Sequence, residues 1–312
     1  MPPSGQGVRH DYRQPSCPPV PRCRDRSVIA VAVAVVRPRA SVRTVHRGLK
    51  LVLLVIAETL AGTLAATLAA LPASATPCPE VFFHGAAPVI ASPRLAAGTH
   101  ELCYQSFAVL ASGLSRTGLW SAEHLTRSSI EAARALGGRH GRWHADANLA
   151  ASERAAPKDY TNSGYDRGHL SPSGDMPTPE TDAETFTMAN VAPQVPHLNR
   201  GSWEQAESLT RDIAVYTGET WVVTGVLFEG ANVQQIGNGV LVPTAFYKAL
   251  LMRGRGAAAY VATNEATPQW RVISLAELKR RSGVDVFPAL PPSVKATAAE
   301  LPMPGARRRR AQ

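Results

Sequence analysis

Three long apolar runs rich in β-branched residues constrain the fold of this chain more than any other feature. They are WVVTGVLF from Trp221, VLVPTAFYKALLM from Val240 and AAAYVATN from Ala257. Gly- and Asn-rich turns separate them, such as the one at residues 236–239. Runs of this kind, closed by turn residues, predict buried strands of one antiparallel sheet.

A helical period interrupts this pattern at residues 202–216, behind a candidate capping box formed by Ser202 and Gln205. A shorter helix is predicted at residues 274–281, ending before Gly283. Because strands stand on both sides of one central helix, the fold class is predicted to be α+β, with a central antiparallel β-sheet flanked by helices.

The first 75 residues predict a leader with a signal peptide. A basic region at about 37–50 precedes an apolar region at 51–71, and small residues place the cleavage site after Ala75. A transmembrane anchor is the alternative, which Glu58 and the threonines of the apolar region disfavour. The predicted domain spans 76–292, followed by a Pro-containing, Arg-ended tail at 293–312. We therefore expect a secreted or periplasmic protein without stable membrane association after cleavage.

The net charge of +9 belongs mostly to this leader. Residues 1–75 hold 10 Lys and Arg against 3 Asp and Glu, whereas the remainder holds 23 against 21. The bulk charge is therefore no evidence that the folded part binds nucleic acid.

Two cysteines, Cys78 and Cys103, follow the leader. In an exported chain they predict one disulfide, which closes a loop of about 25 residues and contributes on the order of 3 kcal/mol. Two free buried thiols are the alternative.

Polar residues that could carry chemistry concentrate in residues 159–207. There the run Asp166-Arg167-Gly168-His169 places an acid, a guanidinium and an imidazole together. Taken singly, each has a structural alternative: His169 can close a local hydrogen bond, Asp166 can cap a turn, and Arg167 can form a surface ion pair.

Asn199, Trp203 and Glu207 are spaced four residues apart, so a helix that begins near Asn199 would place all three on one face. An amide oxygen and a carboxylate on one face suit Mg²⁺. Ordinary packing by Trp203, with Asn199 as a cap and Glu207 in solvent, accounts for the spacing equally well.

Three ordered blocks resemble the DNA/RNA non-specific endonuclease family, the secreted ββα-metal nucleases with a DRGH motif. The blocks are YDRGHLSPSGDM, MANVAPQ and LNRGSW with its following glutamate, and the similarity extends over about residues 78–292. The resemblance implies a ββα-metal catalytic core within the α+β fold.

Matched by position, the resemblance implies that His169 is the general base and that Asn199 is the direct protein ligand of a single Mg²⁺, for which Mn²⁺ can substitute. Glu207 corresponds to the carboxylate that holds water on the metal. The motif positions expected to orient the base, frame the site or contact substrate are Asp166, Arg167, Asn190 and Gln194.

The family also has an arginine before an aromatic-x-x-Asp element, which reads Trp143-His144-Ala145-Asp146 in this sequence. Arg139 and Arg142 both precede it, and we expect Arg139 to contact the scissile phosphate. One departure from the family is Arg200, which stands where glutamine is frequent and adds positive charge to the rim of the site.

The resemblance implies hydrolysis of DNA and RNA without strong sequence specificity, giving 5′-phosphate ends. Two alternatives are an inactive protein that binds nucleic acid and a phosphodiesterase of small esters. A homodimer is left open.

Overall fold

The computed structural model describes residues 76–305, which all belong to one compact unit. The predicted leader, its cleavage site and the end of the predicted tail lie outside the described residues. Among residues 76–305, no helix has the length and apolar character needed to cross a membrane.

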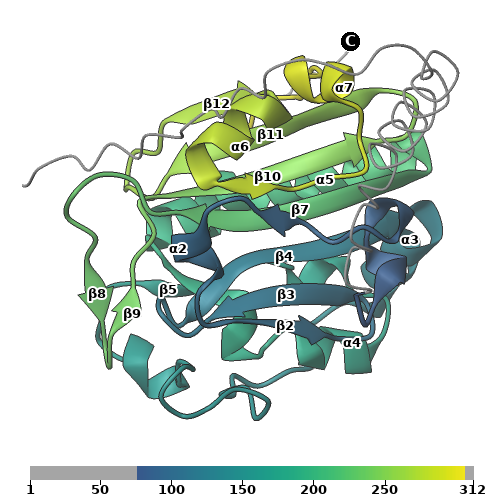
Figure 1. Cartoon of the computed structure of the whole chain (residues 1–312). Coiled ribbons are helices and arrows are strands. Elements are labelled where there is room, and N and C mark those ends of the chain that lie inside the picture. The colour runs from purple at the N-terminus through teal and green to yellow at the C-terminus, as the bar shows by residue number, and fades with distance from the viewer. Residues whose placement is uncertain (1–75, 306–312) are drawn as a thin grey trace, which may run out of the picture. The chain divides into compact units, whose positions relative to one another are not determined.

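A seven-stranded antiparallel sheet in the order β12-β11-β10-β7-β4-β3-β2 forms the centre of the fold (Figure 1). Its strands are β2 (Thr99–Cys103), β3 (Phe107–Ser112), β4 (Thr117–Thr126), β7 (Glu219–Leu227), β10 (Ala245–Met252), β11 (Gly256–Thr263) and β12 (Trp270–Ile273). The three apolar runs of the sequence form β7, β10 and β11 at the middle of this sheet, where every residue of β10 is buried. The predicted α+β class with a central antiparallel sheet is confirmed.

Helices lie on both faces of the sheet. Figure 1 shows α5 on one face, where it contacts β4, β7 and β10, and α6 on the other, where it contacts β7 and β11. The helices are α2 (Pro93–Ala96), α3 (Arg127–Leu136), α4 (Pro179–Glu184), α5 (Glu204–Thr217), α6 (Leu275–Ser282) and α7 (Pro292–Ala296). The predicted helix end at Gly283 is confirmed, since this residue caps α6 in the left-handed region at φ 70°.

Three short pairs of strands stand apart from the main sheet: β1 (Val89–Ile90) with β13 (Val284–Asp285), β5 (Asp166–His169) with β6 (Val191–Gln194), and β8 (Gln235–Ile236) with β9 (Val240–Leu241). The predicted turn at residues 236–239 joins β8 to β9. Single 3₁₀ turns are η1 (Pro79–Val81), η2 (Phe83–Gly85), η3 (Pro157–Tyr160), η4 (Ser173–Asp175) and η5 (Met188–Asn190), and η6 (Leu198–Trp203) is a π-helical turn before α5.

The predicted boundary at residue 292 does not separate a packed part from a free one. Leu301 is buried in a cluster with Tyr260 of β11, and the Tyr260 hydroxyl donates a hydrogen bond to the carbonyl of Pro302. The backbone N–H of Gly305 donates to Gln205 Oε1 on α5. The chain therefore packs against the domain as far as residue 305.

A disulfide joins Cys78 to Cys103 at the end of β2, as predicted. It ties the irregular N-terminal segment to the edge strand of the sheet. We expect the Cys78→Ala/Cys103→Ala variant to lose about 3 kcal/mol of unfolding free energy, measured by urea denaturation, because the open loop gains entropy in the unfolded state. Reductant should destabilise the wild type and leave the variant unchanged, and an equal loss in both would contradict this assignment.

Candidate active site

A cleft of about 430 Å³ opens where β5, the loop after α3 and the start of α5 meet. Four arginines and two glutamates line it together with His169 and Asn199. The charged lining residues are Arg139, Arg167, Arg200, Arg211, Glu204 and Glu207. The cleft thus combines donors for an anion with carboxylates that suit a cation.

His169 is the last residue of β5 and lies opposite Val191 of β6. Its ring packs between two aromatic rings, with centroids 4.8 Å from Trp143 and 5.2 Å from Phe186. Its Nε2 atom is buried and has no hydrogen-bond partner in the described part of the chain. The aromatic walls therefore fix the ring while leaving one nitrogen available.

The pKa of the His169 imidazole is lowered to about 3, chiefly by burial and then by the positive charge of Arg139, against an opposing effect of Asp182. The ring is therefore neutral at pH 7. A neutral imidazole with a free nitrogen can accept a proton.

Asp166, at the other end of β5, fixes the orientation of Asn199. The amide Nδ2 of Asn199 donates to Asp166 Oδ2 at 2.9 Å, and the Arg200 guanidinium binds both oxygens of the same carboxylate. Burial acts to raise the pKa of Asp166, but the hydrogen bonds from Arg200 and Asn199 outweigh it and lower this pKa. With its nitrogen held by a charged carboxylate, the side chain of Asn199 has an oxygen on the cleft wall that accepts no hydrogen bond from residues 76–305.

The regular helix from Asn199 that would place Asn199, Trp203 and Glu207 on one face does not form, and the alternative in which Trp203 packs in the core holds for that residue. Asn199 lies in the π-helical turn η6, in which Gly201 leaves helical geometry at φ −116° and ψ −107°. Trp203 is fully buried and packs on Phe246, whereas Asn199 and Glu207 line the cleft. A π turn changes the rotation from one residue to the next, so residues spaced four apart no longer lie on the same face of the helix.

The predicted capping box of this helix is also wrong. Helix α5 begins at Glu204 without a side-chain cap, and Ser202 Oγ instead accepts a hydrogen bond from Trp270 Nε1 at 3.0 Å. Both residues of the predicted box form tertiary contacts instead, because Ser202 bonds with Trp270 and Gln205 Oε1 accepts a hydrogen bond from the backbone N–H of Gly305.

Glu207 lies on the first turn of α5, half-buried at the floor of the cleft. Its pKa is raised to about 7, chiefly by burial, with Lys248 and Arg211 opposing the rise and the negative charge of Asp175 supporting it. The carboxyl group of Glu207 therefore titrates near neutral pH, and the charges around it determine whether it is protonated.

The structure separates Arg139 from Arg142. Arg139 lines the cleft and acts on the charge of His169, whereas Arg142 is exposed and stands outside the lining. The loop that carries Arg139 is held by Asp182 of α4, which accepts the backbone N–H of His140 at 2.5 Å and pairs with its ring at 3.0 Å.

Arg167 reaches the cleft, where its guanidinium donates to the carbonyl of Pro157 and lies 5.8 Å from the Trp143 ring centroid. Asn190 and Gln194 do not reach it, since both are fully buried. Asn190 binds the backbone of Ser171 through both ends of its amide. These two residues frame the site rather than contact substrate, because their side chains lie inside the protein.

Gln194 packs directly under Gly168, where any side chain would collide with it. Glycine at this position of DRGH therefore lets β5 lie against β6, and the close packing brings His169 to its place.

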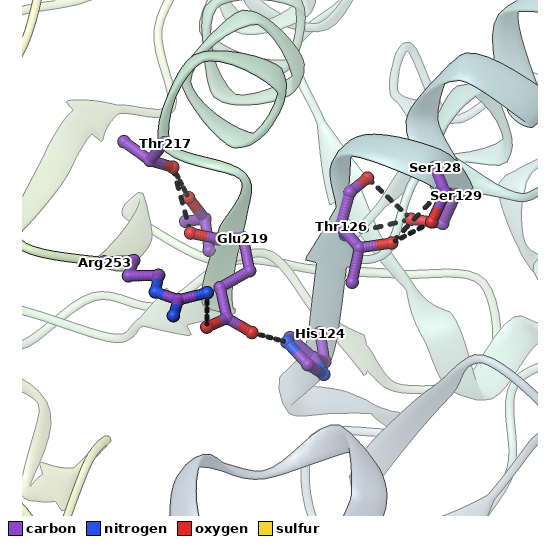
Figure 2. A network of polar contacts seen from close by, with 8 residues as sticks. His124, Thr126, Ser128, Ser129, Thr217, Glu219 and Arg253 are labelled. Carbon is purple, nitrogen blue, oxygen red and sulfur yellow. Dashed lines mark hydrogen bonds and ion pairs between the residues drawn. The ribbon is translucent and has the colours of Figure 1, made fainter.

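His124 of β4 does not line the cleft. Figure 2 shows His124 and Arg253 both directed at the carboxylate of Glu219. His124 Nε2 lies 3.1 Å from Glu219 Oε2, and Arg253 Nη1 lies 3.3 Å from Glu219 Oε1. The ring of His124 stacks on Trp221 at 4.4 Å. This network joins β4 to β7 and serves the fold.

Sequence analysis assigned no role to Asp182 or Arg211. Asp182 contacts His140 in the loop that carries Arg139, and the two residues are 42 positions apart in the sequence. Arg211 pairs with Asp175 at 2.9 Å, and these residues are 36 positions apart. Contacts over such separations leave no local pattern in the sequence. Among residues 76–305, the only group of three or more His, Cys, Asp or Glu side chains close enough to share a metal ion is Cys78, Glu101 and Cys103, and its cysteines are already joined by the disulfide.

Comparisons with known proteins match these features. The model of the DNA/RNA non-specific endonuclease family matches residues 87–293. The mitochondrial nuclease EXOG of Xenopus laevis is 31% identical over 216 residues, covering 62% of this chain and 60% of its own length. The mitochondrial endonuclease G of Bos taurus is 33% identical over 211 residues, covering 61% and 67%. The chain thus spans about three-fifths of the EXOG relative.

A solved structure of an EndoG/EndoGI complex has the same fold, with a TM-score of 0.57 and 24% sequence identity, covering 64% of this chain and 89% of that one. The likeness confirms the expected fold of the catalytic core.

The prediction of a secreted or periplasmic location is contradicted. The relatives from Xenopus laevis, Homo sapiens and Bos taurus are all named as mitochondrial proteins. The names place those relatives in mitochondria, and the residues on which the prediction of export rested lie outside the described part of the chain.

Proposed function

Because the chain belongs to the DNA/RNA non-specific endonuclease family, we propose that it is a metal-dependent nuclease that hydrolyses phosphodiester bonds of DNA and RNA. The observation that carries this proposal is a neutral imidazole in a cleft lined by four arginines and by Asn199, in which the imidazole Nε2 and the amide oxygen have no hydrogen-bond partner among residues 76–305. A base, anion donors and a hard oxygen ligand are the parts that phosphodiester hydrolysis requires.

The residues present fit a divalent cation. Asn199 would hold Mg²⁺ through its oxygen, because Asp166 already binds its nitrogen, and Glu207 would hold water nearby. When bound, Mg²⁺ would polarise a phosphoryl oxygen and stabilise the leaving 3′-oxygen.

The chain's own residues perform the rest of the reaction. His169 takes a proton from the attacking water at Nε2 while Trp143 and Phe186 keep the ring in place. Arg139 neutralises charge that develops on phosphorus. None of these groups reads a base edge, which accounts for activity on both DNA and RNA. The products carry 5′-phosphates.

Digestion of plasmid and RNA by the full chain tests the proposal. Cleavage that needs Mg²⁺ and stops with EDTA is the expected result. Binding without cleavage would identify the inactive nucleic-acid-binding alternative. Activity on a chromogenic phosphodiester with none on plasmid or RNA would identify a phosphodiesterase of small esters.

We expect Arg139→Ala to lower kcat/KM on plasmid by at least about tenfold, because it removes a charged donor to the transition state. Arg142→Ala is the matched control, since Arg142 is exposed outside the cleft, and it should keep wild-type rates. A larger loss in the Arg142 variant would exchange the two roles.

A further inference from the structure

The loop that carries Arg139 leaves helix α3 through two glycines. Gly137 caps α3 at φ 59°, and Gly138 follows at φ 75°, so both have the positive φ that favours glycine. A Cβ atom at Gly137 would meet nothing within 4 Å in the described structure. Because glycine has many accessible conformations and this one is not packed, the chain before Arg139 does not by itself fix the direction of the arginine.

A single carboxylate oxygen holds the residue on the other side of Arg139. Asp182 Oδ2 accepts the backbone N–H of His140 at 2.5 Å and lies 3.0 Å from Nδ1 of the same residue. A carboxylate only accepts, so Nδ1 is the donor of the second bond. The side chain of Asp182 is 1% exposed, whereas that of His140 is 35% exposed. The backbone and the ring of His140 are therefore both attached to a buried group of α4, and hydrogen bonds to a charged acceptor are strong.

The rest of the loop packs against the segment that joins α4 to η5. A Cβ atom at Gly141 would collide with the ring of Phe186, so glycine lets the two parts of the chain approach closely. The backbone N–H of His144 donates to the carbonyl of Phe186 at 3.2 Å, and that of Met188 donates to the carbonyl of His144 at 2.8 Å. Phe186 also packs on the ring of His169. The same segment therefore holds the arginine loop and the proposed base.

We propose that Asp182 and His140 are positioning residues that hold Arg139 in place for the phosphate that the activated water attacks. This inference rests on the proposed nuclease function. Arg139 and His169 line the same cleft, whereas Asp182 and His140 do not. The pair therefore acts through Arg139 rather than by touching substrate. A donor that is fixed in advance needs no reorganisation when charge develops on phosphorus.

Steady-state cleavage of plasmid by the full chain in saturating MgCl₂ tests this inference. We expect Asp182→Ala, which removes both bonds, to lower kcat/KM by about tenfold, because a small displacement of a positioned group is costly. His140→Ala removes only the ring contact and should lower kcat/KM by about threefold, a usual size for one hydrogen bond. KM should not change in either variant, since Arg139 is proposed to act on charge that develops in the transition state.

A double-mutant cycle separates positioning of Arg139 from general support of the fold. In an Arg139→Ala background, Asp182→Ala is expected to have no further effect on kcat/KM, because the group that it positions is absent. A residue that only stabilises the fold would lower the rate by the same factor in both backgrounds. His140→Ala gives the same cycle should Asp182→Ala fold poorly, and it keeps the charge of Asp182, which acts on the pKa of His169.

His124→Ala is the matched control for these variants. His124 also pairs with a carboxylate, that of Glu219 at 3.1 Å, but does not line the cleft, so its replacement should lower Tm without changing kcat/KM. Full activity of both the Asp182 and the His140 variants would overturn the inference, as would equal losses from Asp182→Ala in the two backgrounds. A wild type that cleaves neither plasmid nor RNA would overturn the proposed function itself, on which this inference rests.

Discussion

Replacement of His169 by alanine is expected to lower kcat by at least about 10²-fold while leaving DNA binding in place. The variant loses the only proposed proton acceptor, a neutral imidazole whose Nε2 has no partner among the described residues. It keeps Arg139 and Arg167, which line the cleft and which we propose as the contacts to phosphate. Initial rates on plasmid would give kcat and KM, and filter binding in EDTA would give the affinity for DNA.

His144→Ala is the matched control for this experiment. His144 lies in the same region, but its side chain is exposed, its ring contacts the carbonyl of Arg142, and it stands outside the cleft lining. Its replacement should leave the rate unchanged. Full activity of the His169 variant would remove His169 from the mechanism, whereas similar losses in both variants with lowered Tm would indicate damaged folding.

The strands at the centre of the sheet could be predicted because burial on both faces requires continuous apolar sequence, as in β7 and β10. The pairing of β5 with β6 could not be predicted from the sequence. Strand β5 is the polar run Asp166–His169, only four residues long and mostly half-buried, so neither alternation nor an apolar run marks it. Its place depends on Gln194 packing beneath Gly168, a contact between distant segments.

The residues of the site also divide into those that the sequence predicted and those that it did not. The motif and its resemblance supplied His169, Asn199 and Glu207, and all three line one cleft. The helical count that placed Trp203 beside them failed, because a π turn precedes α5. Lys248 was hidden inside an apolar run that reads as ordinary strand, and only the register of β10 against β7 places it opposite Thr224.

The orientation of Asn199 is the part of the site on which metal binding depends most directly. Asp166 is itself held by Arg200, so the amide nitrogen of Asn199 faces a fixed carboxylate and its oxygen faces the cleft. A rigid neutral oxygen suits a hard cation and adds no charge that would weaken binding of an anionic phosphate. Alanine at this position removes the oxygen and leaves the surrounding charges in place.

Asn199→Ala is therefore expected to raise the Mg²⁺ concentration needed for half-maximal activity by at least about tenfold, since even indirect partners of a metal contribute this much to its affinity. Plasmid cleavage measured over a range of MgCl₂ concentrations would show the shift, with part of the rate recovered at high Mg²⁺. Asn238→Ala, in the exposed turn between β8 and β9, is the matched control and should titrate as the wild type does. An unchanged titration of the Asn199 variant would contradict its assignment as the ligand, because no other change in the cleft could restore the lost oxygen.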